Sequence, residues 1–170
     1  MIRNRQLSLY LESPSLPEEV TLKQAGPEDA EGIFREAEKV IDTYEDFSHV
    51  DRTRALEWTR QNISMYISEY SRILYKNEHA GYIGSHIEDR KLYIDDLYLF
   101  PPFQNKGIGT YLIRQLIEQT NLDVVLHVFR NNTGAFALYR RLGFEIEAEY
   151  DRSRYLMIYR QIPEDDDFGE

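Results

Sequence analysis

A seven-residue stretch of the chain has residue types that suit the binding of a phosphate group. It reads Gln-Asn-Lys-Gly-Ile-Gly-Thr at 104–110, between a predicted strand and a predicted helix. Its two glycines let the backbone turn tightly and point successive N–H groups at one place, where the helix start adds partial positive charge. The stretch lacks the spacing of a Walker loop, and Leu112 stands where a dinucleotide-binding fingerprint has its third glycine. It therefore predicts a phosphate or pyrophosphate site of another kind, with a plain turn as the alternative.

A second group of residues stands downstream, on a predicted strand and the helix after it. It consists of a valine, an asparagine, an alanine, a tyrosine and a Gly-Phe pair: Val128, Asn132, Ala135, Tyr139, Gly143 and Phe144. Together with Gln104, Gly107 and Gly109, this group resembles the two signatures of the GCN5-related N-acetyltransferase (GNAT) superfamily. The resemblance covers residues 20–161. Each signature is weak alone, whereas two at the correct spacing and on the correct elements are specific.

The resemblance implies acetyl-CoA as cosubstrate, no metal, and a set of contacts for the cofactor. The strand before the loop would separate from its neighbour, so that Leu97, Tyr98 and Leu99 pair their main chain with the pantetheine arm like an added strand. Asn132 would contact the pantetheine arm or the neighbouring backbone, Ala135 would contact the cofactor, and Tyr139 would approach the thioester sulfur. The backbone amides of the loop would hold the pyrophosphate, from Gln104, Asn105, Lys106, Gly107, Ile108, Gly109 and Thr110.

Acetyl transfer to an amine needs a base, an acid and a donor for the oxyanion. An amine with a pKa near ~10.4 must lose a proton, which costs about 4–5 kcal/mol at pH 7. A carboxylate can take that proton, and a tyrosine hydroxyl can protonate the departing thiolate, each contributing ~10²–10⁴ in rate. Tyr139 is the predicted acid, with a core position as its alternative, and a free N–H near Leu97 is the predicted oxyanion donor.

Asp95 and Asp96 are the predicted candidates for the base. Adjacent residues of a strand face opposite sides, so only one of the two is expected to point at the reacting carbon. We favour Asp95, because the segment resembles the Glu-Asp-hydrophobic segment of diamine acetyltransferases and Asp95 aligns with its first acid. The other carboxylate would be solvated or would bind the ammonium group of the substrate. The four histidines make no metal-ligand spacing and receive no catalytic role.

The predicted acceptor is a small cationic amine, such as a polyamine or an aminoglycoside-like compound. The acidic and aromatic residues Tyr44, Glu45, Asp46 and Tyr66 fall where this family builds its acceptor pocket. A protein N-terminus or lysine is the alternative acceptor, because 132–144 also resembles the ribosomal-protein acetyltransferases. A non-catalytic acyl-CoA-binding module and a nucleotide-binding protein are alternatives of other classes. The missing Walker lysine and third glycine disfavour the nucleotide-binding protein.

The elements that must position these residues follow from periodicity and turn signals. Strands are predicted at 20–25, 71–76, 80–88, 91–100, 124–128, 144–150 and 155–161, and helices at 27–41, 51–70, 108–120 and 132–142. Short connections make the three strands from 71 to 100 an antiparallel meander, and helix 108–120 a βαβ crossover. The predicted fold is α/β, a mixed and mostly antiparallel twisted sheet flanked by helices, as in GNAT-like N-acyltransferases.

Composition limits the class of protein. The 170 residues suffice for one domain, expected at 18–162, after an arm or extra strand at 1–17 and before an acidic tail at 163–170. The chain has no cysteine, so disulfides and thiolate catalysis are excluded, and its net charge of −10 opposes nucleic-acid binding. We find no signal peptide or membrane span, and expect a cytoplasmic protein. The arm and the closing hairpin could pair across a homodimer.

Overall fold

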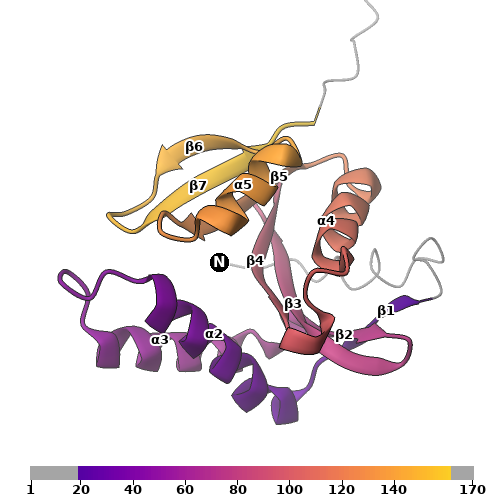
Figure 1. Cartoon of the computed structure of the whole chain (residues 1–170), viewed down its shortest axis with the longest axis horizontal. Coiled ribbons are helices and arrows are strands. Elements are labelled where there is room, and N and C mark those ends of the chain that lie inside the picture. The colour runs from indigo at the N-terminus through magenta and orange to yellow at the C-terminus, as the bar shows by residue number, and fades with distance from the viewer. Residues whose placement is uncertain (1–18, 162–170) are drawn as a thin grey trace, which may run out of the picture.

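The computed structural model describes residues 19–161, which form one seven-stranded sheet with helices on both faces (Figure 1). The predicted mixed α/β fold is confirmed. The arm expected at 1–17 and the tail expected at 163–170 lie outside the described residues.

The strands are β1 (Val20–Gln24), β2 (Tyr70–Tyr75), β3 (Glu78–Glu88), β4 (Lys91–Leu99), β5 (Asp123–Phe129), β6 (Glu145–Glu149) and β7 (Arg154–Tyr159). The helices are α2 (Ala30–Tyr44), α3 (Arg52–Met65), α4 (Ile108–Gln119) and α5 (Thr133–Arg141), with short 3-10 turns η1 (Pro27–Asp29), η2 (Ile67–Glu69) and η3 (Pro101–Phe103). None of the helices between residues 19 and 161 is long and apolar enough to cross a membrane.

The strands follow the order β1-β2-β3-β4-β5-β7-β6 across the sheet. The predicted meander is confirmed, since β2, β3 and β4 pair antiparallel through turns with positive φ at Asn77 and Arg90. The predicted crossover is also confirmed, because α4 joins β4 to its parallel neighbour β5. Strands β6 and β7 form the predicted hairpin. In the sheet, β7 lies between β5 and β6.

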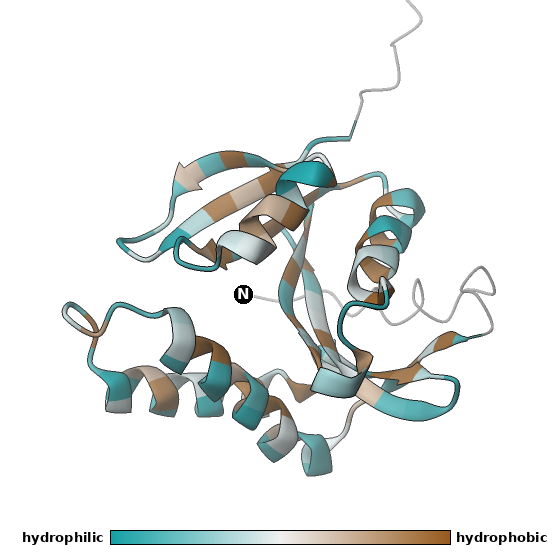
Figure 2. Cartoon of the chain, in the orientation of Figure 1, coloured by the Kyte–Doolittle hydropathy of each residue, from teal (hydrophilic) through white to brown (hydrophobic). Residues whose placement is uncertain are grey.

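Two apolar cores cover the two faces of the sheet. Each helix packs one apolar stripe, spaced three and four residues apart, against the strands, which carry many apolar residues (Figure 2). The first core lies beneath α4 and α5 and includes Ile83, Ile94, Leu112, Leu116 and Phe144. The second core lies beneath α2 and α3 and includes Ile33, Phe34, Ile63, Tyr70 and Tyr82.

A bulge interrupts the ladder between β3 and β4. Gly84 pairs with Asp96, whereas the next residue, Ser85, pairs with Ile94. Asp95 is therefore an extra residue of β4 without a partner in this ladder. Such a bulge changes the side to which the neighbouring side chains point, which decides the arrangement of the site.

Candidate active site

Strands β4 and β5 separate halfway along their length. In the part of the chain that the structure describes, they pair only over Lys91–Ile94 and Asp123–Leu126. Beyond these residues β4 continues to Leu99 and β5 to Phe129. One edge of β4 is left open for another extended chain to pair with, as the family resemblance implies.

The main-chain groups of Leu97 and Leu99 face this open edge. Successive residues of a strand turn their N–H and C=O groups to opposite edges. Phe100 donates its N–H to the carbonyl of Ala80 on β3 at 2.8 Å, so the main chain of Tyr98 also faces β3. Of the three residues expected to pair with the pantetheine arm, Leu97 and Leu99 present backbone groups to it. The expectation for the backbone of Tyr98 is wrong, because that backbone belongs to the ladder with β3.

The loop expected to bind the pyrophosphate begins at the end of the same edge. Gln104 donates its side-chain N–H to the carbonyl of Leu99 at 2.9 Å, which ties the loop to β4. Gly107 has φ 80°, a left-handed conformation that favours glycine, and precedes α4 without a side-chain cap for its N–H groups. A Cβ atom on Gly109 would lie 3.6 Å from the side chain of Leu97 and 3.8 Å from that of Leu99, so this residue of the loop lies over β4. The loop and the open edge of β4 are therefore contiguous.

The remaining loop residues offer mainly backbone to a ligand. Asn105 takes φ 59°, and both Asn105 and Lys106 are exposed. The side chain of Ile108 is buried in the first core, so only its N–H is available. Thr110 is half-buried in the first turn of α4. The N-terminus of this 12-residue helix is suited to an anion.

Helix α5 supplies the residues of the second signature. Asn132 caps the helix, since its side-chain oxygen accepts the N–H of Ala135 at 3.2 Å. The ring of Tyr139 packs 5.9 Å from that of Phe144, half-buried at the edge of the first core. Burial raises the pKa of Tyr139, so its hydroxyl keeps its proton at neutral pH. A protonated hydroxyl is what a proton donor to a thiolate requires.

Asp95 and Asp96 lie on the same face of the sheet. Ile94 and Leu97, on either side of the pair, both pack into the first core. The two carboxylates between them therefore point away from that core, because Asp95 is the extra residue of the bulge. The expectation that only one of them could face the site is wrong for this reason. Regular alternation holds in an unbroken strand and fails at a bulge.

Two tyrosines hold the carboxylate of Asp96. Tyr98 donates its hydroxyl to Oδ1 at 2.6 Å, and Tyr70 donates its hydroxyl to Oδ2. Burial raises the pKa of Asp96 to about 6, against the opposing effect of the two hydroxyls, and the charge of Asp95 raises it further. This carboxylate is ionised at pH 7 and takes up a proton more readily than an ordinary aspartate.

The carboxylate of Asp95 has a different partner. Its Oδ2 lies 2.5 Å from Nδ1 of His86, whose side chain is only 4% exposed and stacks on Tyr93. Glu69 and Glu88 approach the same imidazole at 4.0 and 3.4 Å. Side-chain oxygen and nitrogen atoms of Glu69, His86 and Asp95 lie within 4.8 Å of one another. The spacing of these residues along the sequence does not indicate that they form a cluster. Tyr70 was likewise missed, since nothing in the local sequence links it to Asp96.

A family model of GNAT acetyltransferases matches residues 33–144. The chain belongs to the GNAT family. A probable N-acetyltransferase of Drosophila melanogaster, named san, is 37% identical over 62 residues, 34% of each chain. Spermine/spermidine N(1)-acetyltransferase of Bacillus subtilis is 29% identical over 79 residues, 42% of this chain and 52% of that one. The matches thus span about a third to a half of these curated relatives.

Solved GNAT structures confirm the fold over nearly their whole length. The PaiA N-acetyltransferase of Thermoplasma acidophilum, crystallised with coenzyme A, superposes with a TM-score of 0.62. It is 21% identical, and the match covers 83% of this chain and 98% of that one. The seven-stranded sheet and flanking helices of this GNAT protein therefore have the fold of the family.

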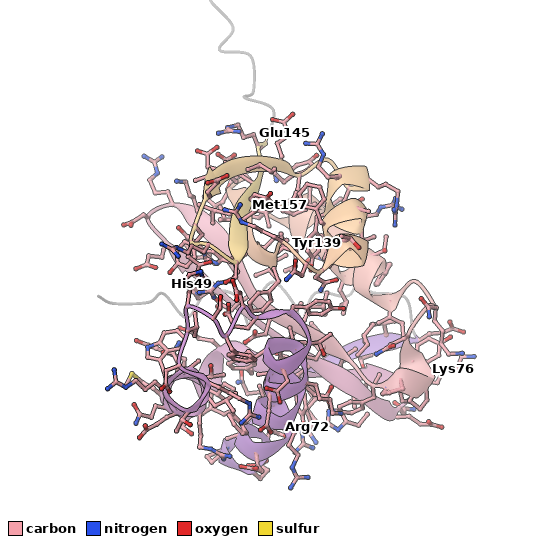
Figure 3. The ribbon with its side chains drawn as sticks, turned by 60° about the vertical axis from the view of Figure 1, so that its left-hand side comes forward. His49, Arg72, Lys76, Tyr139, Glu145 and Met157 are labelled. Carbon is pink, nitrogen blue, oxygen red and sulfur yellow. The ribbon has the colours of Figure 1, made fainter. Side chains whose placement is uncertain are left out.

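At the far end of the site, the α2–α3 connection of this GNAT protein meets the β6–β7 turn. The guanidinium of Arg152 lies 2.9 Å from Nδ1 of His49, which Figure 3 labels on that connection. Tyr44, at the end of α2, stacks on Phe129 of β5 with ring centroids 6.4 Å apart. These contacts join the two halves of the sheet around the region expected to receive the acceptor.

Proposed function

We propose that the protein is an acetyl-CoA-dependent N-acetyltransferase that transfers the acetyl group directly to a small cationic amine. The carboxylate of Asp96, held by two tyrosine hydroxyls beside the open edge of β4, is the observation that carries this proposal. The chain has no cysteine to carry an acetyl group, which favours direct attack of the amine on the thioester.

Acetyl-CoA would bind along β4 and the glycine loop. Leu97 and Leu99 offer main-chain groups to the pantetheine arm, and the amides from Gly107 onward offer N–H groups to the pyrophosphate. The N–H of Leu97 also faces the open edge, so it is available to a developing oxyanion on the thioester carbonyl. Metal chemistry is not needed in this scheme.

Asp96 would act as the base, and we assign it this role in place of Asp95. The raised pKa of Asp96, about 6, narrows the gap to the pKa of an alkylammonium group, near ~10.4. Asp95 instead shares a hydrogen bond with His86 and is more exposed. Its negative charge would help to hold the ammonium group of the acceptor near Asp96.

Tyr139 would act as the acid. Burial raises the pKa of its hydroxyl, so the group carries the proton that the departing thiolate needs. Proton flow would then balance within one turnover. The amine gives a proton to Asp96, directly or through water, and the CoA thiolate takes one from Tyr139. Tyr139 then regains its proton from Asp96 through water, and an acceptor that arrives as an ammonium ion releases its other proton to solvent.

The acceptor would be cationic because the site is acidic. Asp95, Asp96 and Glu69 gather three carboxyl groups at the bulge. The similarity to a bacterial spermine/spermidine acetyltransferase supports a polyamine or related diamine. A peptide N-terminus or lysine is the alternative acceptor, and the same assay tests it.

The test measures CoA release from acetyl-CoA with a panel of spermidine, putrescine, an aminoglycoside and peptides with free N-termini or lysines. We expect turnover with the polyamines at least tenfold above that with the peptides in kcat/KM. Preferential acetylation of peptides would overturn the small-amine acceptor. Binding of CoA in calorimetry without turnover of any amine would support a non-catalytic acyl-CoA-binding module instead.

A further inference from the structure

The ring of Tyr70 lies across β3 at Gly84. In the ladders of the sheet, Tyr70 on β2 pairs with Gly84 on β3, and Gly84 pairs with Asp96 on β4. The Tyr70 hydroxyl nevertheless reaches Asp96, two strands away. A Cβ atom on Gly84 would lie 2.7 Å from Cε1 and 2.9 Å from Cδ1 of Tyr70. The ring therefore occupies the space that a side chain at Gly84 would need.

The spacing of the strands explains why the residue on β3, between Tyr70 and Asp96, has to be glycine. Neighbouring strands lie ~4.8 Å apart, so β2 and β4 are separated by roughly 10 Å. A tyrosine can cover that distance only when its ring lies flat on the sheet, over the backbone of the strand between. Any Cβ at this position would lift the ring and withdraw the hydroxyl from the carboxylate.

The main chain of Tyr70 is also fixed, by hydrogen bonds from the end of β1. Its carbonyl accepts the N–H of Ala25 at 3.0 Å and the side chain of Gln24 at 3.1 Å. Its ring is buried in the second core, with 7% of the residue exposed. Burial keeps the pKa of its hydroxyl well above the usual value, so it stays a donor toward Asp96.

We propose that Gly84 and Tyr70 are positioning residues, in which the bare backbone of Gly84 lets Tyr70 reach across β3 to orient and charge-stabilise the carboxylate of Asp96. This inference rests on the proposed role of Asp96 as base. Other titratable groups also face this carboxylate. Tyr98 and Asp95 come from β4, while Glu36 of α2 and Tyr139 of α5 act on Tyr98. The contribution of Tyr70 must therefore be separated from theirs by matched variants.

The first measurement is the carboxyl ¹³C titration of Asp96 in the full chain, with the signal assigned by Asp96→Asn. Because the Tyr70 hydroxyl stabilises the charged carboxylate, Tyr70→Phe should raise the midpoint by roughly 1 pH unit. Gly84→Ala should raise it similarly, since it displaces the same hydroxyl. The double variant should show no further rise. Tyr82→Phe, which removes another buried hydroxyl of the second core, should leave the midpoint unchanged.

The second measurement is the pH profile of kcat with acetyl-CoA and spermidine. Tyr70→Phe and Gly84→Ala should lose about tenfold in kcat near pH 5 and about threefold near pH 6.5, and should approach the parent rate near pH 9. An equal fractional loss at every pH, with an unmoved ¹³C midpoint, would overturn the inference. If Asp96→Asn keeps the parent rate, the proposed base itself fails. If Asp96→Asn is inactive while Tyr70→Phe and Gly84→Ala leave both the ¹³C midpoint and the pH profile unchanged, only the positioning role fails.

Discussion

Asp95 and Asp96 are consecutive residues of β4 whose carboxylates point to the same face of the sheet, toward different partners. The bulge opposite Gly84 and Ser85 produces this arrangement. Asp95 meets the imidazole of His86, whereas Asp96 meets the hydroxyls of Tyr70 and Tyr98. Two like charges are thereby brought together, and the charge of Asp95 raises the pKa of Asp96. The two neighbouring carboxylates therefore have different surroundings, which is the basis of the different roles proposed for them.

Replacement of Asp96 should abolish most of the chemistry. We expect Asp96→Asn to lower kcat by about 10²-fold or more, because the amide cannot accept the proton of the amine. Asp95→Asn should cost less in kcat and should raise KM for a cationic amine. Steady-state kinetics with acetyl-CoA and spermidine compares the two. A larger loss of kcat in Asp95→Asn would return the base role to Asp95.

The pH dependence of the parent enzyme should report the same carboxylate. A base with a pKa of about 6 is ionised above that pH, so kcat should fall with one proton as the pH drops below 6. The acid limb should disappear from the residual activity of Asp96→Asn. A parent profile whose acid midpoint lies near ~4 would show that an ordinary carboxylate is the base.

Tyr139 should matter for protonation of the thiolate and little for packing. We expect Tyr139→Phe to lower kcat by about 10²-fold while KM for acetyl-CoA stays within about threefold. Tyr159→Phe is the matched control, because its ring packs on Phe144 at 5.8 Å, as the ring of Tyr139 does at 5.9 Å. Unchanged turnover in Tyr139→Phe would leave this tyrosine with a core role only.

The conformation of Gly107 should be required for the pyrophosphate of CoA. Alanine at φ 80° is strained by about 1 kcal/mol and should turn the amides at the start of α4 away from the ligand. We expect Gly107→Ala to weaken the binding of CoA about tenfold in calorimetry. Pantetheine lacks the pyrophosphate, so its binding should be unchanged. Equal weakening of both ligands would place the effect outside the pyrophosphate site.

A buried ion pair at the start of α2 should give the fold an acid-sensitive stability. Asp29, 4% exposed, accepts the guanidinium of Arg72 at 2.7 Å and the N–H of Gly26 at 3.0 Å. Burial alone would raise the pKa of Asp29, but these hydrogen bonds outweigh it and lower the pKa. Its stabilisation should therefore be complete above the unfolded-state pKa near ~3.9 and disappear as the pH falls below the folded-state value.

Urea unfolding tests this prediction. Asp29→Asn should lower the free energy of unfolding by about 2–3 kcal/mol at pH 7, and by less near pH 3. Glu31→Gln is the control, because its pair with Arg60 is half-exposed and should contribute below about 1 kcal/mol. The same loss for Asp29→Asn at both pH values would attribute the effect to packing and not to the charge.

Much of the fold and part of the site could be predicted from the sequence, because the signals are local. Alternation, helical stripes and turn residues act over a few neighbours, so the meander, the crossover and the hairpin were predicted near their observed bounds. The same holds for the glycine loop and for the end of α5, where Gly143 takes φ 100°. A helix N-terminus and its anion site are contained in one continuous segment.

Only the tertiary structure decided how the chemical groups are combined. The insertion of β7 beside β5, the bulge at Asp95 and the reach of Tyr70 over Gly84 all depend on the register between strands. Register is set by how side chains fit across the sheet and beneath the helices, and no short segment contains that information. The sequence therefore determined which chemical groups the chain offers, and packing across β2, β3 and β4 determined that two tyrosine hydroxyls hold Asp96 while His86 meets Asp95.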